Sequence, residues 1–164
     1  MRLPLIFVIA TTVIDSMGIG LILPVMPALL REVSNIPLAE AALYGGVLVT
    51  AFALMQFIFG PVIGSLSDRY GRRPVMLISL LVMALDYIVM ALAGAFWVLL
   101  VGRMVGGIAA ATQSTAAAFM ADISKPEEKA ARFGMIGAAF GMGFVFGPLL
   151  GGLLAEFGTR APFY

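Results

Sequence analysis

Long apolar runs, separated by short polar stretches, dominate the chain. Five such runs cover about residues 3–28, 41–66, 74–93, 96–120 and 133–154. A helix needs about 20 mostly apolar residues to cross the hydrocarbon core of a bilayer, and every run reaches that length. The pattern therefore predicts an all-α membrane protein, in which residues 1–164 form one bundle of five transmembrane helices.

The composition supports a membrane protein and excludes several functional classes. Hydrophobic residues make up 62% of the chain and charged residues 12%, against about 25% charged residues in soluble domains. The chain has neither cysteine nor histidine, so we expect no disulfide framework and no thiolate or imidazole metal site. Proton handling would fall to carboxylates. We find no nucleotide-binding motif and no basic patch for nucleic acid.

The basic residues predict the orientation of the bundle. With the N-terminus inside the cell, seven lysine and arginine side chains lie on the cytoplasmic side and two lie outside. The inner set is Arg2, Arg69, Arg72, Arg73, Lys125, Lys129 and Arg132, and the outer set is Arg31 and Arg160. Because positive charge favours the cytoplasmic side, we expect a multi-pass protein of the inner cell membrane with a cytoplasmic N-terminus.

The densest charged cluster is the turn between the second and third runs, with the sequence GSLSDRYGRRP over residues 64–74. Its candidate functional residues are Gly64, Asp68, Arg69, Gly71, Arg72 and Arg73. A tight basic turn can serve simply as a topology anchor. We also expect a chain of contacts from Asp68 through Arg72 to Asp122, because an acid at a helix C-terminus needs a cationic partner. Asp122 could instead pair with Lys125 or face water.

Three charges interrupt the apolar runs. At about 1.5 Å per residue, Asp15, Asp86 and Arg103 all lie roughly 17–20 Å from the inner face, near one level of the membrane. Charges at that depth normally face a polar interior, so we predict that the three form a substrate and proton site. The alternative is a buried ion pair that locks helix packing. Gln113 is a weaker candidate, because polar side chains also join membrane helices.

Two of the runs carry glycines at helical spacing. Gly60 and Gly64 are four residues apart in the second run, and the fifth run contains Gly143, Gly147, Pro148, Gly151 and Gly152. Small residues four apart form a narrow ridge that lets helices approach closely. We expect both runs to pack through these glycine faces.

Several of these stretches resemble one transporter family. The pattern G-x-x-x-D-R-x-G-R-R of residues 64–73 resembles the loop between helices 2 and 3 of the major facilitator superfamily. The surroundings of Arg103 resemble the fourth-helix motif of proton-coupled members. The glycine-rich stretch from Gly143 to Gly152 resembles the fifth-helix motif of drug:proton antiporters. Residues 15–27, Asp86-Tyr87 and Ala121-Asp122 are similar to the tetracycline efflux group.

The resemblance implies an exporter of twelve helices in two halves, in which protons entering from outside drive a drug outwards. In the tetracycline group the drug is chelated to a divalent cation, which travels with it, and no resident cofactor or metal is implied. This chain then corresponds to the N-terminal bundle without the sixth helix, and its partners are the drug, protons, the bilayer and the C-terminal half. The fifth helix is expected to lie against that other half, and the basic loop to latch the outward-open state.

Other functions remain open at this point. A multidrug or metabolite exporter of the same superfamily could share every motif. The chain could also be a fragment without transport activity of its own. A membrane enzyme using Asp15 and Asp86 as an acid pair is disfavoured, because the sequence offers no nucleophile, metal cluster or large loop beside them.

Overall fold

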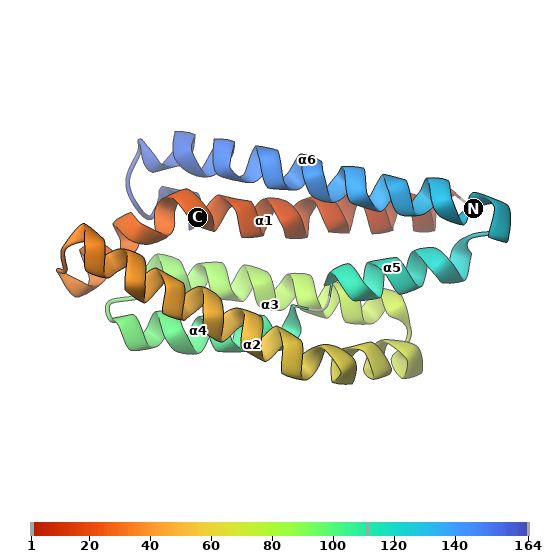
Figure 1. Cartoon of the computed structure of the whole chain (residues 1–164), viewed down its shortest axis with the longest axis horizontal. Coiled ribbons are helices and arrows are strands. Elements are labelled where there is room, and N and C mark those ends of the chain that lie inside the picture. The colour runs from red at the N-terminus through yellow and green to blue at the C-terminus, as the bar shows by residue number, and fades with distance from the viewer. Residues whose placement is uncertain (1, 111, 164) are drawn as a thin grey trace.

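The described residues form six α-helices that run along one common axis (Figure 1). The computed structural model describes residues 2–110 and 112–163, apart from the side chains of Arg2 and Leu38. The helices are α1 (Arg2–Ser34), α2 (Leu38–Tyr70), α3 (Arg72–Leu92), α4 (Phe96–Ala109), α5 (Thr112–Ile123) and α6 (Lys129–Ala155), with short 3-10 helices η1 (Pro126–Glu128) and η2 (Ala161–Phe163).

Within the described ranges, five segments are long and apolar enough to cross a membrane. Three of them are α1, α2 and α3, the fourth combines α4 with α5, and the fifth combines η1 with α6. The all-α fold with five membrane helices is thereby confirmed. The first helix continues to Ser34 rather than ending near Ala28, and Pro24 and Pro27 lie inside it. A proline removes a single backbone hydrogen bond, so the helix can continue beyond it.

The fourth span is not one helix. Its α4 half ends at Ala109, and Ala110 has a ψ angle of 55°, outside the helical range. Gly106 and Gly107 precede this break, and glycine has low helix propensity. The side-chain amide of Gln56 donates a hydrogen bond of 2.6 Å to the Ala110 carbonyl. Backbone groups freed inside a membrane need such a partner, so α2 stabilises the broken conformation.

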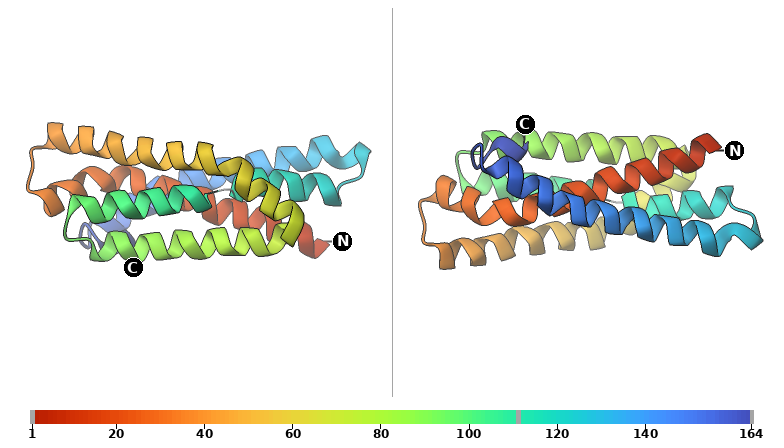
Figure 2. Two further views of the ribbon diagram at one scale, coloured as in Figure 1. Left: turned by 90° about the horizontal axis from the view of Figure 1, so that it is seen from below. Right: turned by 90° about the horizontal axis from the view of Figure 1, so that it is seen from above.

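The helices pack in pairs. α1 packs mainly against α6, α2 packs mainly against α4, and α3 lies against α4 and α5. Figures 1 and 2 show the N-terminus at the same end of the bundle as the turn between α2 and α3. The α1–α2 and α3–α4 connections lie at the opposite end. The basic turn and the N-terminus therefore share one face of the membrane.

Glycines of α6 bring it into backbone contact with α1. Gly143, Gly147 and Gly151 are all buried. A Cβ atom placed on Gly147 would lie 2.9 Å from the Cα of Gly20, closer than real Cβ contacts allow. Pro148 packs on the same Gly20 from the next position. This ridge explains why α1 and α6 form the most extensive pair in the bundle.

The structure shows a partner for one of the two predicted glycine faces. Three glycines of the fifth-helix motif face α1 of the same bundle, and the expected contact of the fifth helix with the other half of a longer protein stays a prediction. In α2, a Cβ atom on Gly60 or Gly64 would meet nothing within 4 Å among the described residues, and the same holds for Gly152. Their spacing predicts a ridge correctly, but it cannot tell which helix, if any, covers that ridge.

Arg160 joins three elements at the end of the bundle opposite the basic turn. Its Nε donates to Glu32 of α1 at 2.8 Å, and its two terminal nitrogens donate to the carbonyls of Ala91 and Ala93. Phe163 of η2 is buried beside Tyr87 of α3. Residues that follow α6 therefore cover the C-terminal end of α3.

Candidate functional site

A small cavity lies among α1, α2, α3 and α4. Its polar lining comes from Asp15 on α1, Gln56 on α2, Ser79, Asp86 and Tyr87 on α3, and Arg103 on α4. Its volume is about 30 Å³, which is room for water and not for a drug-sized molecule. The three charges predicted near one depth therefore do line one cavity, although their part in transport stays a prediction.

Asp86 and Arg103 form a buried ion pair. Asp86 Oδ2 accepts from a terminal nitrogen of Arg103, and the two residues are 5% and 8% exposed. The guanidinium carbon also lies 5.1 Å from the centre of the Phe52 ring, a cation–π arrangement. Gly102 and Gly106 make the approach possible, because a Cβ atom on either one would press against the Asp86 carboxylate.

Asp15 approaches the pair from α1. It lines the same cavity, but it has no ion pair with any residue that the structure describes. Two further polar atoms nearby, the Tyr87 hydroxyl and Arg103 Nε, are buried and lack a hydrogen-bond partner in the described ranges. The cavity thus holds one carboxylate that is paired with an arginine and a second one that has no ion pair among the described residues.

Two amide side chains lie differently with respect to this cavity. Gln113 is exposed on α5 and does not line the cavity, and its part in substrate binding stays a prediction. Gln56 does line it, and was missed. The available signal was that Gln56 is the single amide side chain between Ala41 and Ser67, a run without any charge. Depth along a helix can be counted from the sequence, but the direction of a side chain depends on how the helices pack.

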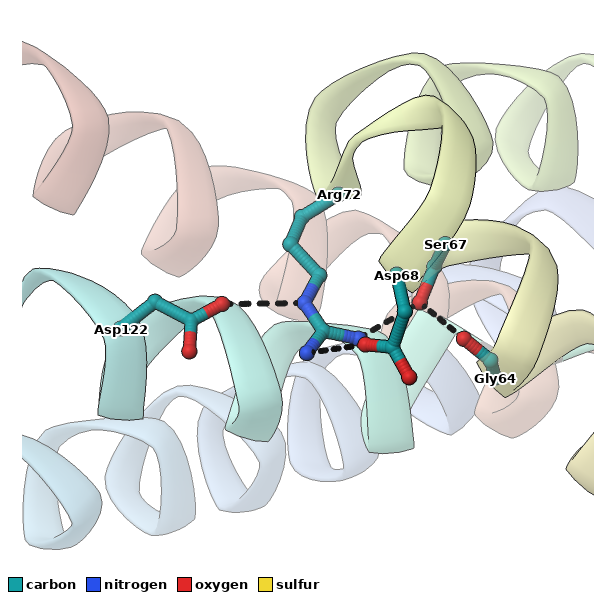
Figure 3. A network of polar contacts seen from close by, with 5 residues as sticks. All are labelled: Gly64, Ser67, Asp68, Arg72 and Asp122. Atoms are coloured by element: carbon teal, nitrogen blue, oxygen red, sulfur yellow. Dashed lines mark hydrogen bonds and ion pairs between the residues drawn. The ribbon is translucent and has the colours of Figure 1, made fainter.

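Arg72 is the centre of a polar network at the inner end of the bundle (Figure 3). It contacts Asp68 at 2.5 Å and Asp122 at 3.0 Å, and it donates to the Ser67 hydroxyl at 2.7 Å. Ser67 in turn donates to the Gly64 carbonyl at 2.7 Å. The predicted chain from Asp68 through Arg72 to Asp122 is present, and it links α2, α3 and α5.

The turn reaches this geometry by ending one helix and starting the next. Gly71 has a φ angle of 97°, which separates α2 from α3 and which other residues rarely adopt. Arg69 and Arg73 lie outside the network, over the rings of Tyr70 and Phe7 respectively. The motif therefore combines one bridging arginine with two arginines that cover aromatic side chains near the membrane surface.

No group of three or more carboxylate residues within the described ranges could hold a metal ion. The polar groups of the cavity instead combine opposite charges at mid-depth in an apolar bundle. Charged side chains in such places typically belong to substrate or ion pathways. The arrangement suits reversible binding of a proton or of a cationic group better than covalent chemistry.

Known proteins similar to this chain include resistance proteins for tetracycline and quinolones. The chain is 47% identical to the tetracycline resistance protein, class C, of Escherichia coli, over 97% of this chain and 40% of that protein. It is 37% identical to the quinolone resistance protein NorA of Staphylococcus aureus, over 90% of this chain and 37% of that protein. The chain therefore spans about 40% of the length of these relatives.

A solved structure shares the fold. The human organic anion transporter MFSD10 superposes with a TM-score of 0.84 and 28% sequence identity, covering 99% of this chain and 44% of that one. A family model described as Major Facilitator Superfamily matches residues 8–164. With its five membrane helices, its mid-depth charges and its basic turn, the chain belongs to the Major Facilitator Superfamily.

Proposed function

We propose that this chain forms most of the first half of a proton-coupled drug exporter, and that tetracycline, as a chelate with a divalent cation, is its substrate. The observation that carries the proposal is the meeting of Asp15, Asp86 and Arg103 in one cavity, in a chain similar to tetracycline resistance proteins over nearly its whole length. Transporters of this kind bind substrates and coupling ions near the bilayer midplane.

The ion pair suggests how a proton could be coupled to movement. While Asp86 is ionised, its attraction to Arg103 holds α3 against α4. A proton on the Asp86 carboxylate would remove its negative charge and, with it, the attraction to Arg103. An adjacent cation stabilises only the ionised form of a carboxyl group. Asp15 carries the second carboxylate of the cavity and would bind the cationic part of the substrate. Proton binding and drug binding would then favour different arrangements of the same helices.

The proposal requires more protein than this chain provides. The cavity of about 30 Å³ is too small for a drug, and the relatives are much longer. We infer that a second half completes the drug site against the exposed faces of the bundle, and that this chain alone does not transport. The divalent cation belongs to the substrate, and no resident cofactor is included.

The Arg72 network is proposed as a latch between conformations. Its acidic partners are more than half exposed, so each pair stabilises the fold by about 1 kcal/mol or less. A bias of that size still shifts the populations of two conformations of similar energy. In the full-length protein, Asp122→Arg should strongly reduce export, and adding Arg72→Asp should restore part of it. The measurement is the rate of export by each of the two variants in membrane vesicles.

A matched control for the latch is Glu128→Arg, which breaks another ion pair, with the half-buried Arg132, at the same end of the bundle. It should leave export close to the wild-type rate. If the reversed pair gives no recovery over Asp122→Arg alone, Arg72 acts as a topology anchor and the latch is wrong.

We place the basic turn and the N-terminus in the cytoplasm, following the excess of basic residues at that end. Because the chain has no native cysteine, single cysteines can report the orientation. Glu127→Cys should react with a membrane-impermeant maleimide only after the cells are opened, whereas Glu156→Cys should react in intact cells. The opposite pattern would invert the orientation.

Drug susceptibility tests the proposed function. The full-length protein, expressed in a sensitive bacterium, should raise the tetracycline concentration needed to stop growth, and Asp15→Asn should abolish the increase. The second candidate is a multidrug exporter, favoured by the 37% identity to a quinolone resistance protein. Protection against quinolones without protection against tetracycline would select it, and protection against neither would reject both.

A further inference from the structure

The fourth membrane span is broken at the level of the charged cavity. Its α4 half ends at Ala109, Ala110 has a non-helical ψ angle of 55°, and its α5 half begins at Thr112. The two halves lie on offset lines along the bundle (Figure 1). Ala110 itself lines the cavity together with Asp15 and Arg103. A change in the shape of this span would therefore act on the cavity that holds the charges.

The local sequence does not account for the position of the break. Gly106 and Gly107 weaken the helix before the break, but both are still helical. The break falls at Ala110, within a run of three alanines at residues 109–111. Alanine has the highest helix propensity of all residues, so a contact from outside the segment is needed to hold the break.

Gln56 of α2 supplies such a contact. Its side-chain amide donates a hydrogen bond of 2.6 Å to the Ala110 carbonyl. α2 and α4 approach closely just before the break, because a Cβ atom on Gly107 would lie 2.9 Å from the Cβ of Met55. A single hydrogen bond between membrane helices contributes little to stability. Loss of this one should therefore change the shape of the span and leave the fold intact.

The break also determines which helices the two halves contact. α4 packs mainly on α2, whereas α5 packs on α3 and α1. Thr112, at the start of α5, is buried there, and its side chain approaches the Asp15 carboxylate of α1. The Thr112 hydroxyl has no partner at full hydrogen-bond geometry among the described residues. It can therefore serve as a hydrogen-bond donor to that carboxylate.

We propose that Gln56 is a positioning residue for the proposed drug site. Its hydrogen bond to the Ala110 carbonyl holds the fourth span in the broken form, and the broken form keeps Thr112 beside Asp15. Without the hydrogen bond, the alanine run joins α4 and α5 into a straighter helix, and Thr112 moves away from the carboxylate. The consequence for drug binding rests on the proposed function, whereas the shape of the span can be measured without transport.

Spin labels at the two ends of the fourth span test the hydrogen bond. They are attached to Trp97→Cys and Lys125→Cys, two exposed positions, in full-length protein from which other cysteines have been removed. A straight helix between them would be about 42 Å long, and a broken one is shorter. Gln56→Met keeps nearly the same side-chain length without the donor, and should move the distance distribution towards the longer value. Gln113→Met, at the exposed amide beside the break, should leave it unchanged.

Drug transport tests the positioning of Asp15. Gln56→Met should raise the KM for tetracycline about tenfold and change the maximal rate by less than about twofold, as expected when binding alone is weakened. Thr112→Val should raise the KM in the same way, because it removes the donor beside the carboxylate. It should not change the spin-label distances, because the hydrogen bond from Gln56 is still present.

Each outcome decides one part of the inference. An unchanged distance distribution in folded Gln56→Met would overturn it, whatever the transport result. A longer distance with an unchanged KM would refute the positioning of Asp15. If Gln56→Met is not recovered as folded protein, Gln56→Asn, whose side chain is one methylene shorter, takes its place. Absence of tetracycline transport by the wild-type protein would contradict the proposed function, and the distances alone would then decide the role of Gln56.

Discussion

Replacing Gly147 with leucine in the full-length protein should abolish export by preventing α1 and α6 from packing. A Cβ atom at this position would already overlap the Met17 carbonyl and lie 2.9 Å from Gly20 Cα. Backbone atoms cannot move aside as the end of a flexible side chain can. Extra methylenes in a well-packed core typically cost about 1–3 kcal/mol of folding free energy. Because the leucine would meet backbone atoms, we expect a loss above about 3 kcal/mol.

Gly152→Leu is the matched control for this prediction. Gly152 belongs to the same motif of α6, but a Cβ atom there meets nothing within 4 Å among the described residues. The amount of monodisperse protein extracted from membranes should fall sharply for Gly147→Leu and stay near wild type for Gly152→Leu. Equal amounts of folded protein and equal export for the two variants would contradict the backbone contact between α1 and α6.

Replacing Arg103 with alanine should abolish export and destabilise the bundle. The change leaves the Asp86 carboxylate buried without its counter-ion, and removing one partner of a buried pair typically costs about 3–5 kcal/mol. Arg73→Ala is the control, because Arg73 covers Phe7 at 5.3 Å much as Arg103 covers Phe52 at 5.1 Å. Arg73 is exposed, so its loss should cost about 1 kcal/mol or less.

A double variant separates stability from function at this pair. Asp86→Ala added to Arg103→Ala removes the unpaired buried charge but leaves a cavity, so we expect the unfolding temperature in detergent to recover part of its loss. Export should stay absent, because the carboxylate that we propose as the proton-binding group is gone. Recovery of export in the double variant would mean that the pair only holds the helices together.

The apolar runs are enough to predict five membrane helices, because each run alone meets the length that a bilayer requires. They do not predict the break at Ala110. The sequence there is small and apolar, and the broken backbone depends on the amide of Gln56, which is 54 residues away. Gly106 and Gly107 lower the helix propensity before the break, but nothing in either segment shows that Gln56 and Ala110 are partners.

The sequence predicts those residues of the candidate site that can be identified by their depth in the membrane. Asp15, Asp86 and Arg103 could be placed at one level by counting residues, and all three line the cavity. The directions of side chains were not predictable in the same way. Gln113 points outwards and Gln56 inwards, although both are amides in apolar helices. The glycines of α6 show the same limit, since spacing gives a ridge but does not identify its partner.

Tetracycline uptake into everted membrane vesicles that contain the full-length protein tests the central proposal most directly. With a proton gradient, acid inside, the vesicles should accumulate the drug in the presence of a divalent cation. An uncoupler should release it, and vesicles with Asp15→Asn should accumulate none. Accumulation that persists after the gradient has been collapsed, or wild-type accumulation by Asp15→Asn, would contradict proton-coupled export through this site.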